Sequence, residues 1–93
     1  MIDVVRKTCT AEVTEPFSFS TASVAFKVKN FTDDVILVCL GTWDENQSVM
    51  IQSGVAETVM HNPDPANYMT RDTTDTVLVK STVSGVVEVL RND

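Results

Sequence analysis

The sequence predicts an all-β protein: an antiparallel β-sandwich of seven or eight short strands with jelly-roll or immunoglobulin-like connections. Valine, threonine and other β-branched residues dominate the chain, and no long stretch has the periodicity of an amphipathic helix. Short segments with strand patterning are separated at regular spacing by turn residues, which is typical of a sandwich or a small barrel. We favour the sandwich and expect no helix longer than a single turn.

Length and charge narrow the class of protein further. With 93 residues, the chain is predicted to form one domain over residues 1–93, and 43% hydrophobic against 22% charged residues indicates a folded chain. The net charge of −6, with the few cations scattered over several segments, argues against binding to nucleic acid. No apolar run approaches the roughly 20 residues that cross a bilayer, and the N-terminus is not typical of a secretory signal. We therefore expect no membrane association and a reducing cytoplasm as the place of synthesis.

The first third of the chain predicts an N-terminal arm or edge strand followed by two strands. Residues 1–15 form the arm or edge strand, within which residues 3–14 make one long strand or two short ones that end at Pro16, since proline cannot donate a ladder hydrogen bond. Residues 17–20 alternate and predict a short edge strand. Residues 22–30 alternate again, so Ala22, Val24, Phe26 and Val28 are expected on one buried face.

The segment Val35–Leu40 is apolar at every position and predicts a central strand that is covered on both faces. It follows a polar turn at residues 32–34, which makes either a hairpin or a corner that crosses between sheets. Two kinds of cover remain open for its outer face. One is this chain's own N-terminal arm or the 61–75 loop, and the other is a neighbouring chain.

The second half predicts four more strands around one long loop. Residues 43–46 form a polar connection, and residues 48–52 and 55–60 are two short strands joined at Ser53-Gly54. Residues 61–75 contain two prolines and predict a long irregular loop, which is uncommon in a domain this small. Residues 76–81 and 86–90 predict a hairpin that turns at Ser84-Gly85.

No catalytic, metal-binding or cofactor-binding residues are predicted, and we expect a protein that is not an enzyme and uses no cofactor. His61 is the single histidine and has no local nucleophile signature, and Cys9 and Cys39 lie in predicted strands as buried free thiols. The acidic pairs lack the spacing of a calcium loop. Two triplets match the glycosylation acceptor pattern, beginning at Asn30 and Asn46, but no secretory signal gives them a context.

Several segments together resemble the small virion proteins of tailed bacteriophages that are found as head or capsid-associated structural proteins. The similarity extends over most of the chain from Phe17 onward, and it rests on Phe17-Ser-Phe-Ser, Phe26-Lys-Val-Lys-Asn-Phe-Thr-Asp, Gly54-Val-Ala-Glu57 and the ending Val79-Lys-Ser-Thr-Val-Ser-Gly-Val-Val-Glu-Val89. The resemblance implies a decoration (cement), head-fibre or head–tail joining protein that is assembled in the bacterial host cytoplasm and resides in the virion. Its implied partners are the major capsid protein or another virion protein, together with copies of itself.

We predict that apolar side chains in the central strand, in the connection after it and around the long loop form the assembly contact. Methionine and aromatic residues are enriched at such interfaces. The predicted contact residues are Ile36, Val38, Leu40, Trp43, Met60, Tyr68 and Met69.

The alternative function is a carbohydrate-binding β-sandwich module on a host-recognition structure. Trp43 and Tyr68 would then be the ring platforms for a sugar. The phenylalanines, Phe31 among them, mostly lie at strand positions that indicate the core.

Overall fold

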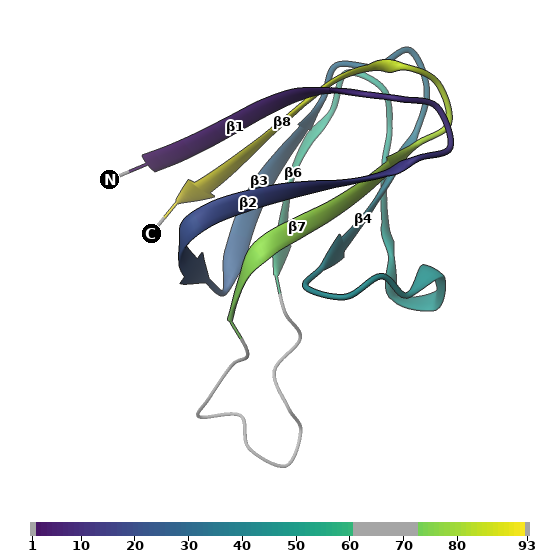
Figure 1. Cartoon of the computed structure of the whole chain (residues 1–93). Helices are drawn as coiled ribbons and strands as arrows, with labels where there is room; N and C mark the ends of the chain where they lie inside the picture. The colour runs from purple at the N-terminus through teal and green to yellow at the C-terminus, as the bar shows by residue number, and fades with distance from the viewer. Residues whose placement is uncertain (1, 61–72, 93) are drawn as a thin grey trace.

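The structure, a computed structural model, describes residues 2–60 and 73–92, without the side chains of Ile2 and Asn92, and is a two-layer β-sandwich (Figure 1). This confirms the all-β antiparallel sandwich predicted from the sequence. One helical element is described, the single 3-10 turn η1 (Glu45–Gln47). The strands are β1 (Ile2–Cys9), β2 (Thr14–Ser23), β3 (Ala25–Asn30), β4 (Ile36–Leu40), β5 (Val49–Ile51), β6 (Ala56–Met60), β7 (Thr74–Ser81) and β8 (Gly85–Asn92).

The strand order identifies the sandwich as a jelly roll. The first sheet has the order β1-β8-β3-β6 and the second the order β2-β7-β4-β5, with antiparallel pairing throughout. Every connection crosses from one sheet to the other except the one between β4 and β5. Eight strands wound in this way form a double-sheet jelly roll, whereas an immunoglobulin sandwich divides its strands differently. Of the two connection patterns expected, the jelly roll is the one found.

Three predicted turns are therefore corners between sheets. The polar turn at residues 32–34 leads from β3 in the first sheet to β4 in the second, and Ser53-Gly54 leads from β5 back to β6. The predicted hairpin through Ser84-Gly85 is wrong, because β7 pairs with β2 and β4 whereas β8 pairs with β1 and β3. A turn beside a glycine serves a crossover as well as a hairpin, so the local sequence does not distinguish the two.

The prediction that Pro16 ends a strand is also wrong. Pro16 lies inside β2, opposite Leu78 of β7. Because β2 is an edge strand with a single neighbour, its outer side needs no ladder donor, and a proline is tolerated there.

The predicted strand over residues 22–30 is divided into the end of β2 and the whole of β3. The break falls at Val24, where the Ser23 hydroxyl accepts from the backbone N–H of Ala25 at 3.3 Å. The division leaves Ala22 exposed and Val24 half-buried, so only Phe26 and Val28 lie on the buried face as expected.

The core lies between the two sheets and is built by the inward positions of all eight strands. Alternate residues of β7 and β8, for example Val77 and Val79 or Val87 and Val89, are fully buried. The rings of Phe19 and Phe26 pack against each other across the sheets with centroids 5.2 Å apart. The core residues are Cys9, Phe17, Phe19, Phe26, Val28, Ile36, Val38, Ile51, Val59, Val77, Val79, Val87 and Val89.

Candidate functional site

The inward side chains of the apolar central strand are buried by this chain itself. Ile36 and Val38 of β4 are both 0% exposed and pack in the core between the sheets. Side chains with no accessible surface cannot touch a partner without opening the sandwich. The prediction that Ile36 and Val38 form the assembly contact is therefore corrected, because both are core residues.

The outer face of β4 is covered in part by the connection that follows it. The Cys39 thiol is 4% exposed and donates to the backbone carbonyl of Asp44, with 3.3 Å between sulfur and oxygen. Asp44 caps η1, because its carboxylate accepts from the backbone N–H of Asn46 at 3.0 Å. This cover is intramolecular, and it comes from the residue 43–48 connection rather than from the described part of the N-terminal arm. The 61–75 loop lies mostly outside the described residues.

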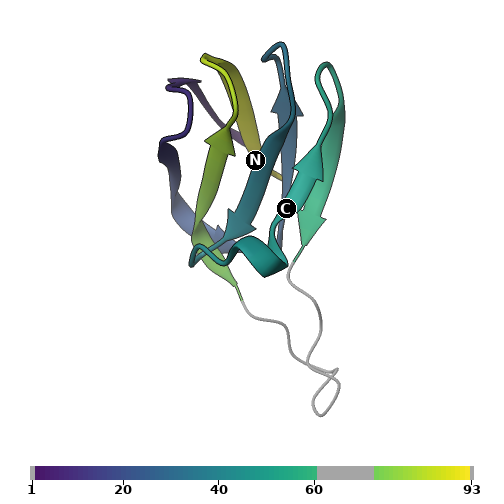
Figure 2. The same ribbon diagram turned by 90° about the vertical axis from the view of Figure 1, so that its right-hand side faces the viewer.

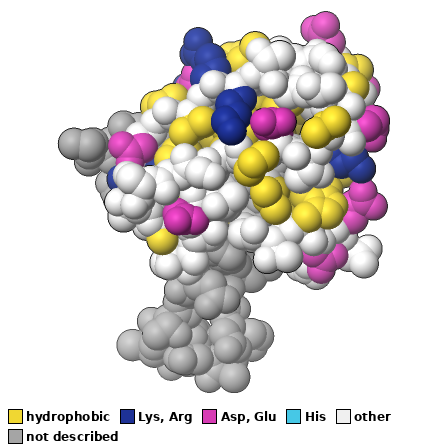
Figure 3. Space-filling model, in the orientation of Figure 1, with side chains coloured by type: hydrophobic (Ala, Val, Ile, Leu, Met, Phe, Trp, Pro, Cys, Tyr) yellow, Lys and Arg dark blue, Asp and Glu magenta, His cyan; other side chains and the backbone are white. Residues whose placement is uncertain are grey.

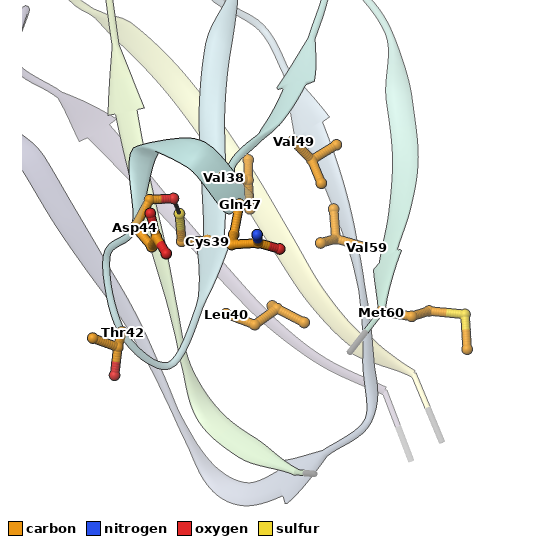
Figure 4. Close-up of a pocket in the computed structure, with 9 residues that line it drawn as sticks. All are labelled: Val38, Cys39, Leu40, Thr42, Asp44, Gln47, Val49, Val59 and Met60. Carbon is orange, nitrogen blue, oxygen red and sulfur yellow. Dashed lines mark hydrogen bonds between the residues drawn. The ribbon is translucent and has the colours of Figure 1, made fainter. Parts of the chain in front are cut away.

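Leu40 and Met60, two other predicted contact residues, line a hollow of about 390 Å³ at the open edge of the sandwich (Figure 4). Its floor is apolar and is made by inward residues of β4, β5 and β6, whereas its rim is polar. Figure 4 shows Leu40, Val49 and Val59 directed toward the same space, with Met60 at its margin. The lining residues are Val38, Cys39, Leu40, Thr42, Asp44, Gln47, Val49, Val59 and Met60.

The hollow can accept a small apolar group and offers amide, hydroxyl and carboxylate groups at its mouth. Leu40 is half-buried and Met60 is 47% exposed, so both are accessible. Trp43 is half-buried and is not among the residues that line the hollow. Tyr68 and Met69 lie outside the described residues, as does His61.

The two cysteines are both buried free thiols in the structure, as predicted. Burial, with a smaller contribution from the nearby Glu15 carboxylate, raises the pKa of the Cys9 thiol to about 11, while Lys7 opposes the shift. A thiol in this state is not a nucleophile at neutral pH. Within the described part of the chain, no three histidine, cysteine or acidic side chains are clustered so that they could hold a metal ion.

A charge network crosses the outer face of the first sheet, and the sequence analysis missed it. Glu88 in β8 lies between Arg6 of β1 and Lys29 of β3, accepting from the Arg6 Nε at 2.9 Å and lying 3.4 Å from the Lys29 Nζ. The hydrogen bond from Arg6 lowers the pKa of the Glu88 carboxyl. The network could be found only from the strand pairing, because its members are distant in sequence.

Asn30 begins one of the two glycosylation acceptor triplets, yet in the structure it is a buried structural residue. Its side-chain amide donates to the backbone carbonyls of Asp34 at 2.8 Å and of Ile51 at 3.0 Å. Its carbonyl oxygen accepts from the Thr32 backbone N–H at 2.9 Å and from the Thr32 hydroxyl at 2.7 Å. With 1% exposure and every amide position occupied, Asn30 is not available for glycan attachment in the folded protein.

Phe31 corrects another expectation, because it is 55% exposed rather than part of the core. It follows Asn30 at the start of the corner between β3 and β4, and its backbone N–H donates to the Val86 carbonyl at 3.1 Å. The Arg6 guanidinium lies 6.0 Å from the centre of its ring. The aromatic side chain is therefore fixed at the backbone while its ring is presented to solvent.

Comparisons with known proteins identify no relative of the chain. No protein-family model matches it, and neither a curated protein nor a solved structure matches. In the part of the chain that the structure describes, no helix is long and apolar enough to span a membrane.

Proposed function

We propose that this chain is a non-enzymatic virion structural protein, a capsid decoration or other head-associated protein that stabilises the shell through protein–protein contacts. The observation that carries the proposal is the jelly-roll order of the two sheets, β1-β8-β3-β6 and β2-β7-β4-β5. Viral capsid domains are among the proteins built on this architecture, together with lectin domains and cupins. The strand order therefore supports the class of protein that the sequence segments resemble.

Exposed apolar side chains supply a second line of support. Large apolar side chains that are exposed in the described part of the chain include Phe31 at 55%, Met60 at 47% and Val13 at 46%. Contacts through such side chains are individually modest, but they give high avidity when identical copies repeat over a lattice. The partner would be the major capsid protein or a neighbouring virion protein, and copies of this chain would meet on the shell.

Co-sedimentation with capsids tests this function. Purified protein is mixed with empty capsids of the virus whose genome encodes the chain, and the pelleted fraction is measured against protein concentration. We expect saturable binding with a fixed number of copies per shell. Absence of binding, together with a monomer in analytical ultracentrifugation at high concentration, would contradict the proposal.

A second candidate is the carbohydrate-binding module, which the hollow beside β4 and β6 favours. Its rim carries Thr42, Asp44 and Gln47, side chains that can hydrogen-bond sugar hydroxyls, and lectin domains share the jelly-roll architecture. Binding to a glycan array that disappears in Gln47→Ala, with the free energy of unfolding unchanged, would rank this function above the first. An array without signal would remove it.

A further inference from the structure

Four connections meet at one end of the sandwich, and we call residues 10–13, 31–35, 52–55 and 82–84 the loop end. They join β1 to β2, β3 to β4, β5 to β6 and β7 to β8, and both ribbon views place them together, at the top in Figure 2. The winding of the jelly roll brings them there, because each of these connections crosses between the sheets at the same end.

Hydrogen bonds tie the four connections to one another. The Ser84 hydroxyl accepts from the Ala11 backbone N–H at 3.2 Å, which joins the first connection to the last. The Thr82 hydroxyl donates to the Val35 carbonyl at 3.2 Å, which joins the last to the second. The Ser53 hydroxyl donates to the Thr32 carbonyl at 2.6 Å, which joins the second to the third. A surface held in this way loses little conformational entropy when it binds.

The loop end carries three of the large apolar side chains that are exposed in the described part of the chain. Phe31 is 55% exposed, Val13 46% and Val55 38%, and they come from three different connections. The corner that carries Phe31 is joined to the connection that carries Val55, because the backbone N–H of Asn30 donates to the Val55 carbonyl at 3.0 Å. Large exposed apolar side chains that gather in one region mark interaction sites more often than single ones do.

The charged residues of the loop end are all acidic. Glu12, Asp33 and Asp34 lie in these connections with exposed side chains, and the four segments contain no lysine or arginine. Two cations lie beside the loop end, since Lys80 is 3.9 Å from Glu12 and the Arg6 guanidinium is 6.0 Å from the centre of the Phe31 ring, but no cation of the described chain is within ion-pair distance of Asp33 or Asp34. Figure 3 shows acidic and apolar side chains, with some basic ones among them, along the upper and right-hand margins, where these connections lie in Figure 1.

We infer that the loop end is a docking surface for a protein face that presents apolar side chains among lysines and arginines. The inference rests on the proposed function and names the surface through which the protein would bind the shell. Acidic groups around an apolar patch attract a basic face and repel an acidic one, so the charge pattern selects the partner. Two copies meeting loop end to loop end would bring six carboxylates together, so a second copy at this surface is disfavoured.

The test compares two loop-end variants with two matched controls in the capsid co-sedimentation assay. Phe31→Ala is matched by Met50→Ala, because Met50 is also 55% exposed but lies on the outer face of the second sheet. Asp33→Lys is matched by Glu57→Lys, which makes the same charge reversal at an exposed position in β6. We expect each loop-end variant to lose at least about fivefold in affinity and each control to bind like the wild type. The salt dependence of binding should also be weaker in Asp33→Lys than in the wild type.

The outcomes separate the two proposals. A wild type that does not bind capsids contradicts the proposed function and the docking surface with it. If both loop-end variants bind capsids as tightly as the wild type does, the docking surface alone is contradicted. It is also contradicted if the two control variants lose as much affinity as the loop-end variants. If Phe31→Ala fails to fold, Val55→Ser replaces it with the same expectation. If Phe31→Ala abolishes self-association in ultracentrifugation but not capsid binding, the occupant is a second copy and the basic partner is wrong.

Discussion

Replacement of Asn30 by alanine should strongly destabilise the protein. The variant loses four hydrogen bonds in a site that is 1% exposed. Each such bond contributes a net 0.5–1.5 kcal/mol or so, which bounds the loss at about 2–6 kcal/mol. Two groups keep a partner, because the Thr32 hydroxyl, no longer donating to Asn30, can donate to the Asp34 carbonyl 2.7 Å away. We therefore expect the free energy of unfolding to fall by about 2–4 kcal/mol.

That loss is large for a chain of this size. At roughly 0.05–0.15 kcal/mol per residue, a domain of 93 residues has a total stability on the order of 5–14 kcal/mol. Equilibrium urea denaturation followed by circular dichroism measures the change, with the dependence on urea concentration expected to stay the same. Asn46→Ala is the control, since Asn46 is the exposed asparagine of the other acceptor triplet and should change stability by less than about 0.5 kcal/mol.

Asn30→Asp distinguishes the contribution of the hydrogen bonds to stability from the contribution of side-chain volume. The substitution keeps the shape but places a carboxylate oxygen where the amide now faces the carbonyls of Asp34 and Ile51. At neutral pH it should cost at least as much as Asn30→Ala, and the difference should shrink in acid because a protonated carboxyl regains one donor. A loss below about 1 kcal/mol for Asn30→Ala, with an unchanged urea dependence, would refute the reasoning.

Three further predictions follow from the same structure. Gly85→Ala should lower stability by about 1–3 kcal/mol in the same assay, because a Cβ there would lie 2.9 Å from Thr32 side-chain carbons, and a loss below about 0.5 kcal/mol would contradict it. Glu88→Gln should be less stable than the wild type at neutral pH. Since the pKa of Glu88 is lowered in the folded state, its contribution is present above its ordinary value of 4.5 and disappears as the pH falls through the folded value, so urea midpoints of the two proteins should converge in acid. The Cys9 thiol has a pKa of about 11, so at pH 8 it should react with a thiol reagent far more slowly in folded Cys39→Ala protein than in the same protein unfolded in urea. Equal rates would show that the thiol is accessible in the folded protein.

The sequence predicts which side chains of a strand face the core, because the alternation of apolar and polar side chains is a property of that one segment. Phe17 and Phe19 in β2 and Phe26 and Val28 in β3 are buried at every second position, as the pattern requires. Counting by two from Phe26 also places Asn30 inward and Phe31 outward, which is what the structure has. The expectation that Phe31 belongs to the core came from its chemistry and ignored this register.

The sequence of one segment does not indicate which other strands it pairs with. The Ser84-Gly85 turn has the composition of a hairpin, yet Gly85 is needed for a different reason: β8 begins against Thr32, in the corner of another connection. That contact joins residues more than 50 positions apart, so neither residue alone indicates it. Both partners of β8 likewise come from the first third of the chain.

The cover on the outer face of the apolar strand is another contact that local sequence does not indicate, here the contact of a single side chain. Six apolar residues in a row indicate that both faces are covered, and the structure covers Cys39 with the carbonyl of Asp44. A backbone carbonyl is present at every residue, so no pattern in the sequence marks the one that serves. The apolar run Val35–Leu40 therefore does not indicate whether this chain or another subunit supplies the cover, since a short connecting segment covers Cys39 as well as a partner would.

Asn30 connects the stability of the fold to the proposed docking surface. It lies beneath the corner that carries Phe31, and its side-chain amide bonds to Asp34 within that corner and to Ile51 at the end of β5. Loss of these bonds should loosen the corner without removing any exposed side chain, so Asn30→Ala should weaken capsid binding through disorder of the loop end. Phe31→Ala should weaken it without a large loss of stability, because the Phe31 ring is already in solvent. A pair of variants that lose binding to a similar degree, one unstable and one stable, would indicate that the loop end acts through its fixed shape as well as through the ring.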